Sequence, residues 1–207
     1  MYSWCCEITY CCVSYNTPNS WREIMSDNQE IKVWDLVVRG FHWLTVTLCV
    51  LNLFILEEGH RNHRYVGYTL SALLLVRIVW GFYGSHYARF TQWFPTPARV
   101  IGYLKATMKK EHPYHVGHNP VGSLMIMLLL TCLIGTALTG ILTNYEDLFG
   151  DDVMEEIHGG FATALQAAIF IHVLAVIVID HLTKGDLIRA MITGKKRVPS
   201  GVEISDR

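Results

Sequence analysis

Charge is scarce in this sequence, and so are the cysteine motifs that hold metals or covalently attached cofactors. Only 17% of the 207 residues are Asp, Glu, Lys or Arg, whereas a soluble domain typically carries about 25%. The formal net charge of −1 provides no basic surface for nucleic acid, which we exclude as a partner. Neither C-x-x-C nor C-x-x-C-H occurs among the six cysteines, so no thiolate metal site is expected.

Apolar residues are abundant instead, and they are concentrated in four blocks. These blocks, each about twenty residues long, cover residues 36–56, 65–84, 121–142 and 157–181. Such a length spans a hydrocarbon core of about 30 Å as a helix. None of the blocks shows the alternation of a membrane barrel, so helices remain the expected structure. We predict an all-α fold, an integral membrane four-helix bundle surrounded by lipid.

Lys and Arg are distributed unequally among the connections. The turn between the third and fourth blocks contains neither residue type. The connection after the second block and the C-terminal tail are basic, through Arg89, Arg99, Lys105, Lys109 and Lys110 and through Lys184, Arg189, Lys195, Lys196 and Arg197. Because positive residues stay on the cytoplasmic side, both termini are expected there, in a multi-pass protein of a bacterial inner membrane.

The segments outside the blocks carry weaker signals. Residues 1–24 lack the basic and apolar regions of a signal peptide, so we interpret them as an extension before a natural start at Met25; a lipidated cysteine-rich tail is the alternative. We expect a disordered leader over 1–30, the membrane domain over 31–199 and a tail over 200–207. An amphipathic interfacial helix is expected over 97–110.

The fourth block contains two histidines, His158 and His172. Fourteen positions bring their side chains within about 40° of each other around a helix and about 21 Å apart along it. A polar ring inside a membrane helix is costly and indicates function. The two rings therefore suggest two separate haems stacked across the bilayer, each of which needs a second axial ligand.

Helix direction suggests where those second ligands lie. With both termini inside, His42 and His172 are near the inner side, whereas His63 and His158 are near the outer side. A bis-histidine haem needs two rings at one depth, so we predict the pairs His42–His172 and His63–His158. Each of the four could alone be an ordinary interface residue. His60 is a weaker candidate that competes with His63. The histidines His86, His112, His115 and His118, in or beside the basic loop, are expected to be solvated. A copper or zinc site formed by His112, His115 and His118 is a less favoured alternative.

Glycines and arginines near these histidines complete the candidate site. Gly67 lies one turn after His63, and Gly159 follows His158 directly. Small residues there allow close helix packing or make room for a porphyrin face. Three arginines, Arg39, Arg77 and Arg89, are candidate partners for the haem propionates. Snorkelling towards the membrane surface is the simpler alternative for all three.

Several short motifs together resemble the bacterial cytochrome b-561 family, in its branch related to the b-type cytochrome subunit of Ni/Fe hydrogenases. They are R-x-x-H-W at 39–43, H-R-x-x-G-Y at 63–68, R-I-V-W-G-F-x-G-S at 77–85, A-R-F at 88–90, G-H-N-P at 117–120 and H-G at 158–159. The resemblance implies a four-helix bundle with two non-covalent haems b. Carried over by motif, the iron ligands are His42, His63, His158 and His172. The hydrogenase subunits usually have an additional helix, which disfavours a hydrogenase partner.

Transmembrane electron transfer is the function that these features predict. Electrons would pass between the quinone pool and a redox partner, such as a periplasmic cytochrome c or a soluble reductase. The chain could act alone, as a homodimer or as a quinone oxidoreductase subunit. Two alternatives remain: a cofactor-free proton or ion relay through the histidines and Asp180, and a structural membrane anchor for a soluble reductase. The basic loop after the second block is best interpreted as a connecting loop without a binding role. A contact with quinone or with anionic lipid is the alternative.

Overall fold

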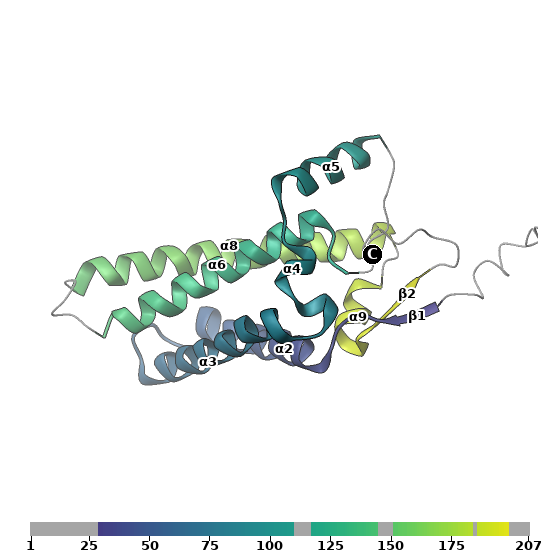
Figure 1. Ribbon diagram of the computed structural model, residues 1–207. Helices are drawn as coiled ribbons and strands as arrows, with labels where there is room; N and C mark the ends of the chain where they lie inside the picture. The colour runs from purple at the N-terminus through teal and green to yellow at the C-terminus, as the bar shows by residue number, and fades with distance from the viewer. Residues whose placement is uncertain (1–28, 110–116, 145–150, 184–185, 199–207) are drawn as a thin grey trace, which may run out of the picture.

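The computed structural model describes residues 29–109, 117–144, 151–183 and 186–198 (Figure 1). The elements in chain order are β1 (Gln29–Lys32), α2 (Leu36–Val50), the π-helix η1 (Leu51–Ile55), α3 (Arg61–Tyr83), η2 (His86–Ala88), α4 (Phe90–Trp93), α5 (Pro97–Met108), α6 (Pro120–Leu142), α8 (Asp151–Thr183), α9 (Leu187–Thr193) and β2 (Lys195–Val198). The expected extension over 1–24 and the tail over 200–207 lie outside the described residues.

Four of these helices are long and apolar enough to cross a membrane. They cover Leu36–Ile55, Arg61–Tyr83, Pro120–Leu142 and Asp152–His181, which confirms the predicted all-α fold with four membrane helices. Local sequence explains where two of them begin. Asp35 accepts a hydrogen bond from the Val38 amide, and Asn119 accepts one from the Gly122 amide ahead of a proline at the first helical position. These are ordinary N-caps.

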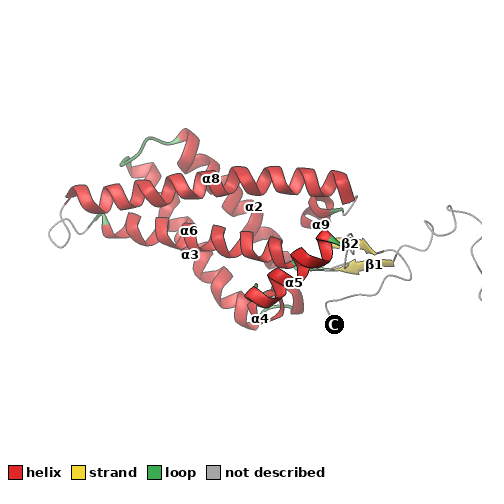
Figure 2. Cartoon of the chain, turned by 90° about the horizontal axis from the view of Figure 1, so that it is seen from above, coloured by secondary structure: helices red, strands yellow, loops and turns green. Residues whose placement is uncertain are grey.

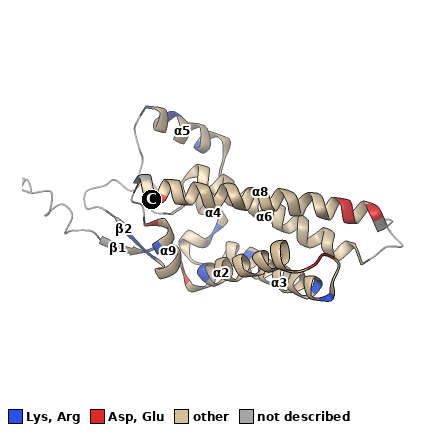
Figure 3. Cartoon of the chain, turned by 180° about the vertical axis from the view of Figure 1, so that it is seen from behind, with Lys and Arg blue, Asp and Glu red and all other residues tan. Residues whose placement is uncertain are grey.

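The membrane helices form two packed pairs. Helix α2 packs along α3, α6 packs along α8, and α3 joins the pairs by packing against α6 (Figures 1 and 2). Their common core contains Leu70, Leu74, Leu133 and Leu165 together with the free thiols Cys49 and Cys132. Both cysteines are therefore buried small apolar residues, as expected. Charged residues gather at the ends of the bundle, as Figure 3 shows.

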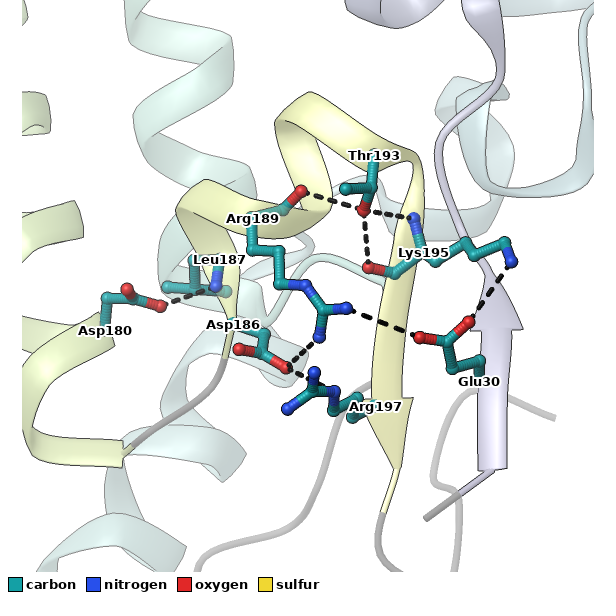
Figure 4. A network of polar contacts seen from close by, with 8 residues as sticks. All are labelled: Glu30, Asp180, Asp186, Leu187, Arg189, Thr193, Lys195 and Arg197. Atoms are coloured by element: carbon teal, nitrogen blue, oxygen red, sulfur yellow. Dashed lines mark hydrogen bonds and ion pairs between the residues drawn. The ribbon is translucent and has the colours of Figure 1, made fainter.

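One end of the bundle carries a small cap, which we call the cap end: β1, β2 and α9, beside the start of α2 and the end of α8. Strands β1 and β2 pair antiparallel, with Ile31 opposite Lys196. Arg189 forms ion pairs with Glu30 and Asp186 at 3.5 Å each, and Asp180 accepts a hydrogen bond from the Leu187 amide (Figure 4). A hydrogen bond from Lys195 and its charge hold the pKa of Glu30 below its ordinary value.

The cap was not predicted from the sequence. Its strands have four residues each and are separated by more than 160 residues, so no local hairpin signal exists. Strand β1 also includes Gln29 and Glu30, two residues before the expected start of the domain. The cap joins the two ends of the described chain next to the beginning of α2.

Asp35 connects the start of α2 to the end of α3. Its carboxylate accepts hydrogen bonds from the Trp80 indole at 2.9 Å and from the Ser85 hydroxyl at 2.5 Å, besides the capping bond from Val38 at 2.8 Å. Burial acts to raise the pKa of Asp35, but these hydrogen bonds outweigh it and hold the pKa below its ordinary value of 3.8. The ionised carboxylate is therefore the form that stabilises the fold.

We expect Asp35→Ala to lower the free energy of unfolding by about 2–3 kcal/mol, because a helix cap and two bonds to a charged acceptor are lost. The carboxylate's contribution is complete above its ordinary pKa and disappears as the pH falls through the lowered pKa. Thermal unfolding in detergent at several pH values measures both effects. Asp35→Asn keeps a capping oxygen and should lose less. Equal melting temperatures for all three proteins would contradict the assignment.

Candidate functional site

His63 and His158 lie side by side at the end of the bundle opposite the cap. His63 is in the first turn of α3, and His158 is two turns into α8. Their ring centroids are 6.2 Å apart, with an angle of 79° between the ring planes. Each ring also lies within electrostatic range of the other. The structure thus brings together two histidines that are 95 residues apart in the sequence.

Helix α6 fixes the ring of His158. Nδ1 of His158 lies 3.0 Å from the backbone oxygen of Thr136 and 3.2 Å from the Thr139 hydroxyl. Because a carbonyl oxygen only accepts, Nδ1 must donate its hydrogen to Thr136, which leaves Nε2 as the bare nitrogen of the neutral ring. This arrangement is typical of metal-ligating histidines, whose second nitrogen donates to a carbonyl.

Gly140 provides the space that the His158 ring occupies. A Cβ atom at Gly140 would lie 2.8 Å from Cε1 and 3.2 Å from Nδ1 of the ring. Neither distance is an ordinary van der Waals contact, so a side chain here would displace the imidazole. Small residues commonly let membrane helices approach closely; here the glycine lets α6 approach the His158 side chain of α8.

His42 and His172 form the second group, towards the cap end. His42 is in the second turn of α2, and His172 is in the second half of α8. The two side chains are close enough to interact electrostatically. The Trp43 ring lies 5.1 Å from that of His42, edge to face, and the Trp43 indole donates to the backbone oxygen of Met191 at 3.3 Å. The cap therefore holds the helix turn that carries His42.

Two ring nitrogens in these groups have no hydrogen-bond partner among the described residues. They are the buried Nδ1 atoms of His42 and His63. An unsatisfied buried polar atom costs about 1–3 kcal/mol. Within the described residues, α8 also packs less closely against α2 and α3 than against α6. The histidines therefore face one another across the more loosely packed part of the bundle.

The three predicted arginines lie in different environments. Arg39 donates from Nη1 to the Ile192 oxygen at 2.5 Å, while its Nε is buried without a partner. Arg77 is buried with 5% of its surface exposed; both terminal nitrogens lie 3.4 Å from the Ala88 oxygen, and its guanidinium lies 5.0 Å from the centre of the Phe90 ring. Arg89 is exposed on the connection to α4.

The two predicted glycines also differ. Gly67 lies next to Asn52, whose Nδ2 would be 3.8 Å from a Cβ there and donates to the His63 backbone oxygen at 3.3 Å. Asn52 belongs to the π-helix η1, and its Oδ1 is buried without a partner. Such π-helical turns are frequent at functional sites. Gly159 borders open space, because a Cβ added to it would have no neighbouring atom within 4 Å.

The expectation for His118 was wrong. His118 is not a solvated loop residue, because its ring lies 4.4 Å from that of Trp34 and 5.3 Å from that of Trp93. No sequence signal pointed to this packing, since Trp34 and Trp93 are distant in the chain. His112 and His115, the other members of the candidate copper or zinc site, lie outside the described residues. His60 is exposed and lies 3.7 Å from Glu57.

Membrane helices with facing histidines define a class of protein, the membrane cytochromes that hold haem within a helical bundle. The family profile described as prokaryotic cytochrome b561 matches residues 33–194. The chain therefore belongs to the prokaryotic cytochrome b561 family. The matched region begins just before α2 and ends just after α9, so it includes all four membrane helices.

Two curated relatives agree with this assignment. A probable Ni/Fe-hydrogenase B-type cytochrome subunit of Bradyrhizobium diazoefficiens is 26% identical over 170 residues, which cover 70% of this chain and 68% of that protein. A protein of the same description from Rhizobium leguminosarum bv. viciae is 23% identical over 217 residues, covering 82% and 90%. No solved structure matches the chain. The chain is thus a membrane protein of electron transport that uses b-type haem.

Proposed function

We propose that this protein is a dihaem b-type cytochrome that transfers electrons across the membrane between the quinone pool and a redox partner. The observation that carries the proposal is the pair of histidine groups at two levels of one bundle, His63 with His158 and His42 with His172. Both groups use α8, where fourteen residues separate the two histidines and correspond to about 21 Å. With one cofactor at each level, an electron would have only a short distance to cross between them within the bilayer.

The donor set supports haem at both levels. A metal–imidazole bond is about 2 Å long, so two imidazoles on one ion have ring centres on the order of 6 Å apart. The separation of His63 and His158, 6.2 Å, agrees with this value. The His158 ring also agrees, because its Nδ1–H donates to Thr136 and leaves the bare Nε2 as the nitrogen that would bind iron.

A haem held by two histidines supplies one-electron chemistry without an open iron position. The protein's own residues hold the site in place. Thr136 fixes the His158 tautomer, Asn52 fixes the backbone at His63, and the Trp43–Met191 bond holds the turn of His42. The surrounding apolar helices exclude water from the site. This exclusion and the nearby charges would set the reduction potential of the haem.

Arg39 is the best candidate for a propionate partner, since its buried Nε is aimed at no protein group. Arg77 is a weaker candidate because both of its terminal nitrogens lie near the Ala88 oxygen. The exposed Arg89 side chain makes no hydrogen bond or ion pair with the described residues, so it is also available for such a role. Gly67 and Gly159 would leave room beside the cofactors.

We place the cap end and both termini in the cytoplasm of a bacterial cell, from the distribution of Lys and Arg. A soluble reductase or a periplasmic cytochrome c would be the redox partner.

The purified protein is expected to show a reduced-minus-oxidised spectrum of haem b and a haem content of two per chain. Pyridine haemochrome assay against quantitative amino-acid analysis measures this ratio. Reduction by a short-chain quinol analogue tests the exchange with quinones. A colourless, folded preparation would favour the ion relay instead. Electron flow that survives His42→Ala and His63→Ala would favour a structural anchor.

A further inference from the structure

Helix α5 presents three distinct faces. At 100° per residue, Val100, Tyr103 and Ala106 share one face, and they are the half-buried residues of α5, which packs against α6. The remaining sides of the helix contact no other part of the described bundle as closely. Figure 1 shows α5 standing apart from the membrane helices, near the cap end.

The second face is apolar and exposed. Ile101, Leu104 and Met108 have 52%, 48% and 85% of their surface accessible, and they lie within about 60° of one another around the helix. Phe94, just before α5, is 49% exposed. Because these side chains are exposed, packing within the described bundle does not explain their apolar character.

The third face is basic. Lys105 lies about 40° and Lys109 about 80° from Ile101 around the helix, so both lysines border the apolar face. Neither lysine has an ion-pair partner in the part of the chain that the structure describes. Arg99 lies farther round the helix and donates to the Phe94 oxygen at 3.4 Å. No Asp or Glu occurs in α5, so the helix carries positive charge alone.

We propose that α5 is a membrane-surface helix that binds acidic phospholipids, with Ile101, Leu104 and Met108 inserted beside the acyl chains and Lys105 and Lys109 on the headgroup phosphates. The described segment 84–96, which includes α4, holds the start of α5 near the end of α3, at the edge of the bilayer that α3 crosses. A helix with an apolar face bordered by lysine binds such a surface, and anionic headgroups complement the unpaired lysines. Neither the haem ligands nor the redox partner enters this proposal.

Spin labels on opposite sides of α5 test the proposal. Leu104→Cys and Gly102→Cys differ by about 160° around the helix, in a background with Cys5, Cys6, Cys11 and Cys12 replaced by Ser. The labelled full-length protein is placed in nanodiscs of phosphatidylcholine, with and without phosphatidylglycerol. With phosphatidylglycerol, the label at 104 should be accessible to oxygen and shielded from a water-soluble nickel complex, whereas the label at 102 should show the reverse.

Lysine variants separate the charge effect from the apolar effect. Lys105→Gln and Lys109→Gln should each weaken the response to phosphatidylglycerol about fivefold. Lys195→Gln is the matched control, because Lys195 is already paired with Glu30, and it should change nothing. Three results would each overturn the proposal. The first is equal nickel accessibility at 102 and 104. The others are shielding that changes neither with lipid charge nor with the lysine substitutions, and shielding that appears only when another protein is added. The measurement does not depend on haem content.

Discussion

His63→Ala and His158→Ala are expected to remove the same haem, and His42→Ala and His172→Ala the other. Each single variant should lose roughly half of the haem b absorbance or convert it to a five-coordinate form, because a bis-histidine site needs both axial ligands. The double variant His63→Ala/His158→Ala should resemble either single variant. Redox titration followed at the haem b absorbance measures which of the two components disappears.

The reason for this grouping is the position of each histidine in the bundle. His63 and His158 are in contact, whereas His172 is fourteen residues farther along α8, about 21 Å away. No single cofactor could be held by rings that are so far apart. Residues that act as one unit give strongly non-additive effects when they are changed together, which is why the double variant is informative.

His60→Ala is the matched control for this series. His60 lies one residue before α3, is exposed and contacts Glu57, so its loss should leave both components unchanged. If His42→Ala and His158→Ala removed the same component, the pairing would be wrong. If all four variants lost all haem and still folded, the two sites would not be independent.

Much of this arrangement could be predicted because it depends on regular helical geometry. The 3.6-residue period and the length of a membrane helix place His42, His63, His158 and His172 at two levels without any tertiary information. The pairing followed from helix direction alone. The structure places His63 beside His158 and His42 near His172, while their role as iron ligands stays a prediction.

The contacts that support these histidines could not be predicted in the same way. The acceptor for Nδ1 of His158 is the backbone oxygen of Thr136, and every residue has such an oxygen, so no residue type marks it. The sequence also contains no signal for the cap, because β1 and β2 are short and lie near opposite ends of the described chain. In the sequence His118 resembles a loop histidine, and only the fold brings the Trp34 and Trp93 rings close to it.

Gly140→Ala is expected to remove or alter the haem at His63 and His158 and to leave the other haem unchanged. The added methyl group would lie 2.8 Å from Cε1 of His158, so the ring must move away from Thr136. Overpacking of this kind costs about 1–3 kcal/mol. Alanine favours a helix over glycine by about 1 kcal/mol, so a weaker α6 cannot explain the loss. Haem content, midpoint potentials and the electron paramagnetic resonance signal of the oxidised protein measure the result.

Gly135→Ala separates the effect on His158 from a general loss of packing between α6 and α8. Gly135 lies on the same helix, and a Cβ there would overlap the ring of Phe161 on α8 rather than a histidine. This variant should therefore lower the melting temperature as much as Gly140→Ala while both haem components keep their potentials. If the two variants changed the haem equally, Gly140 would matter only for helix packing. We assign Gly140 to the histidine site because the His158 imidazole occupies the space that a side chain at position 140 would fill.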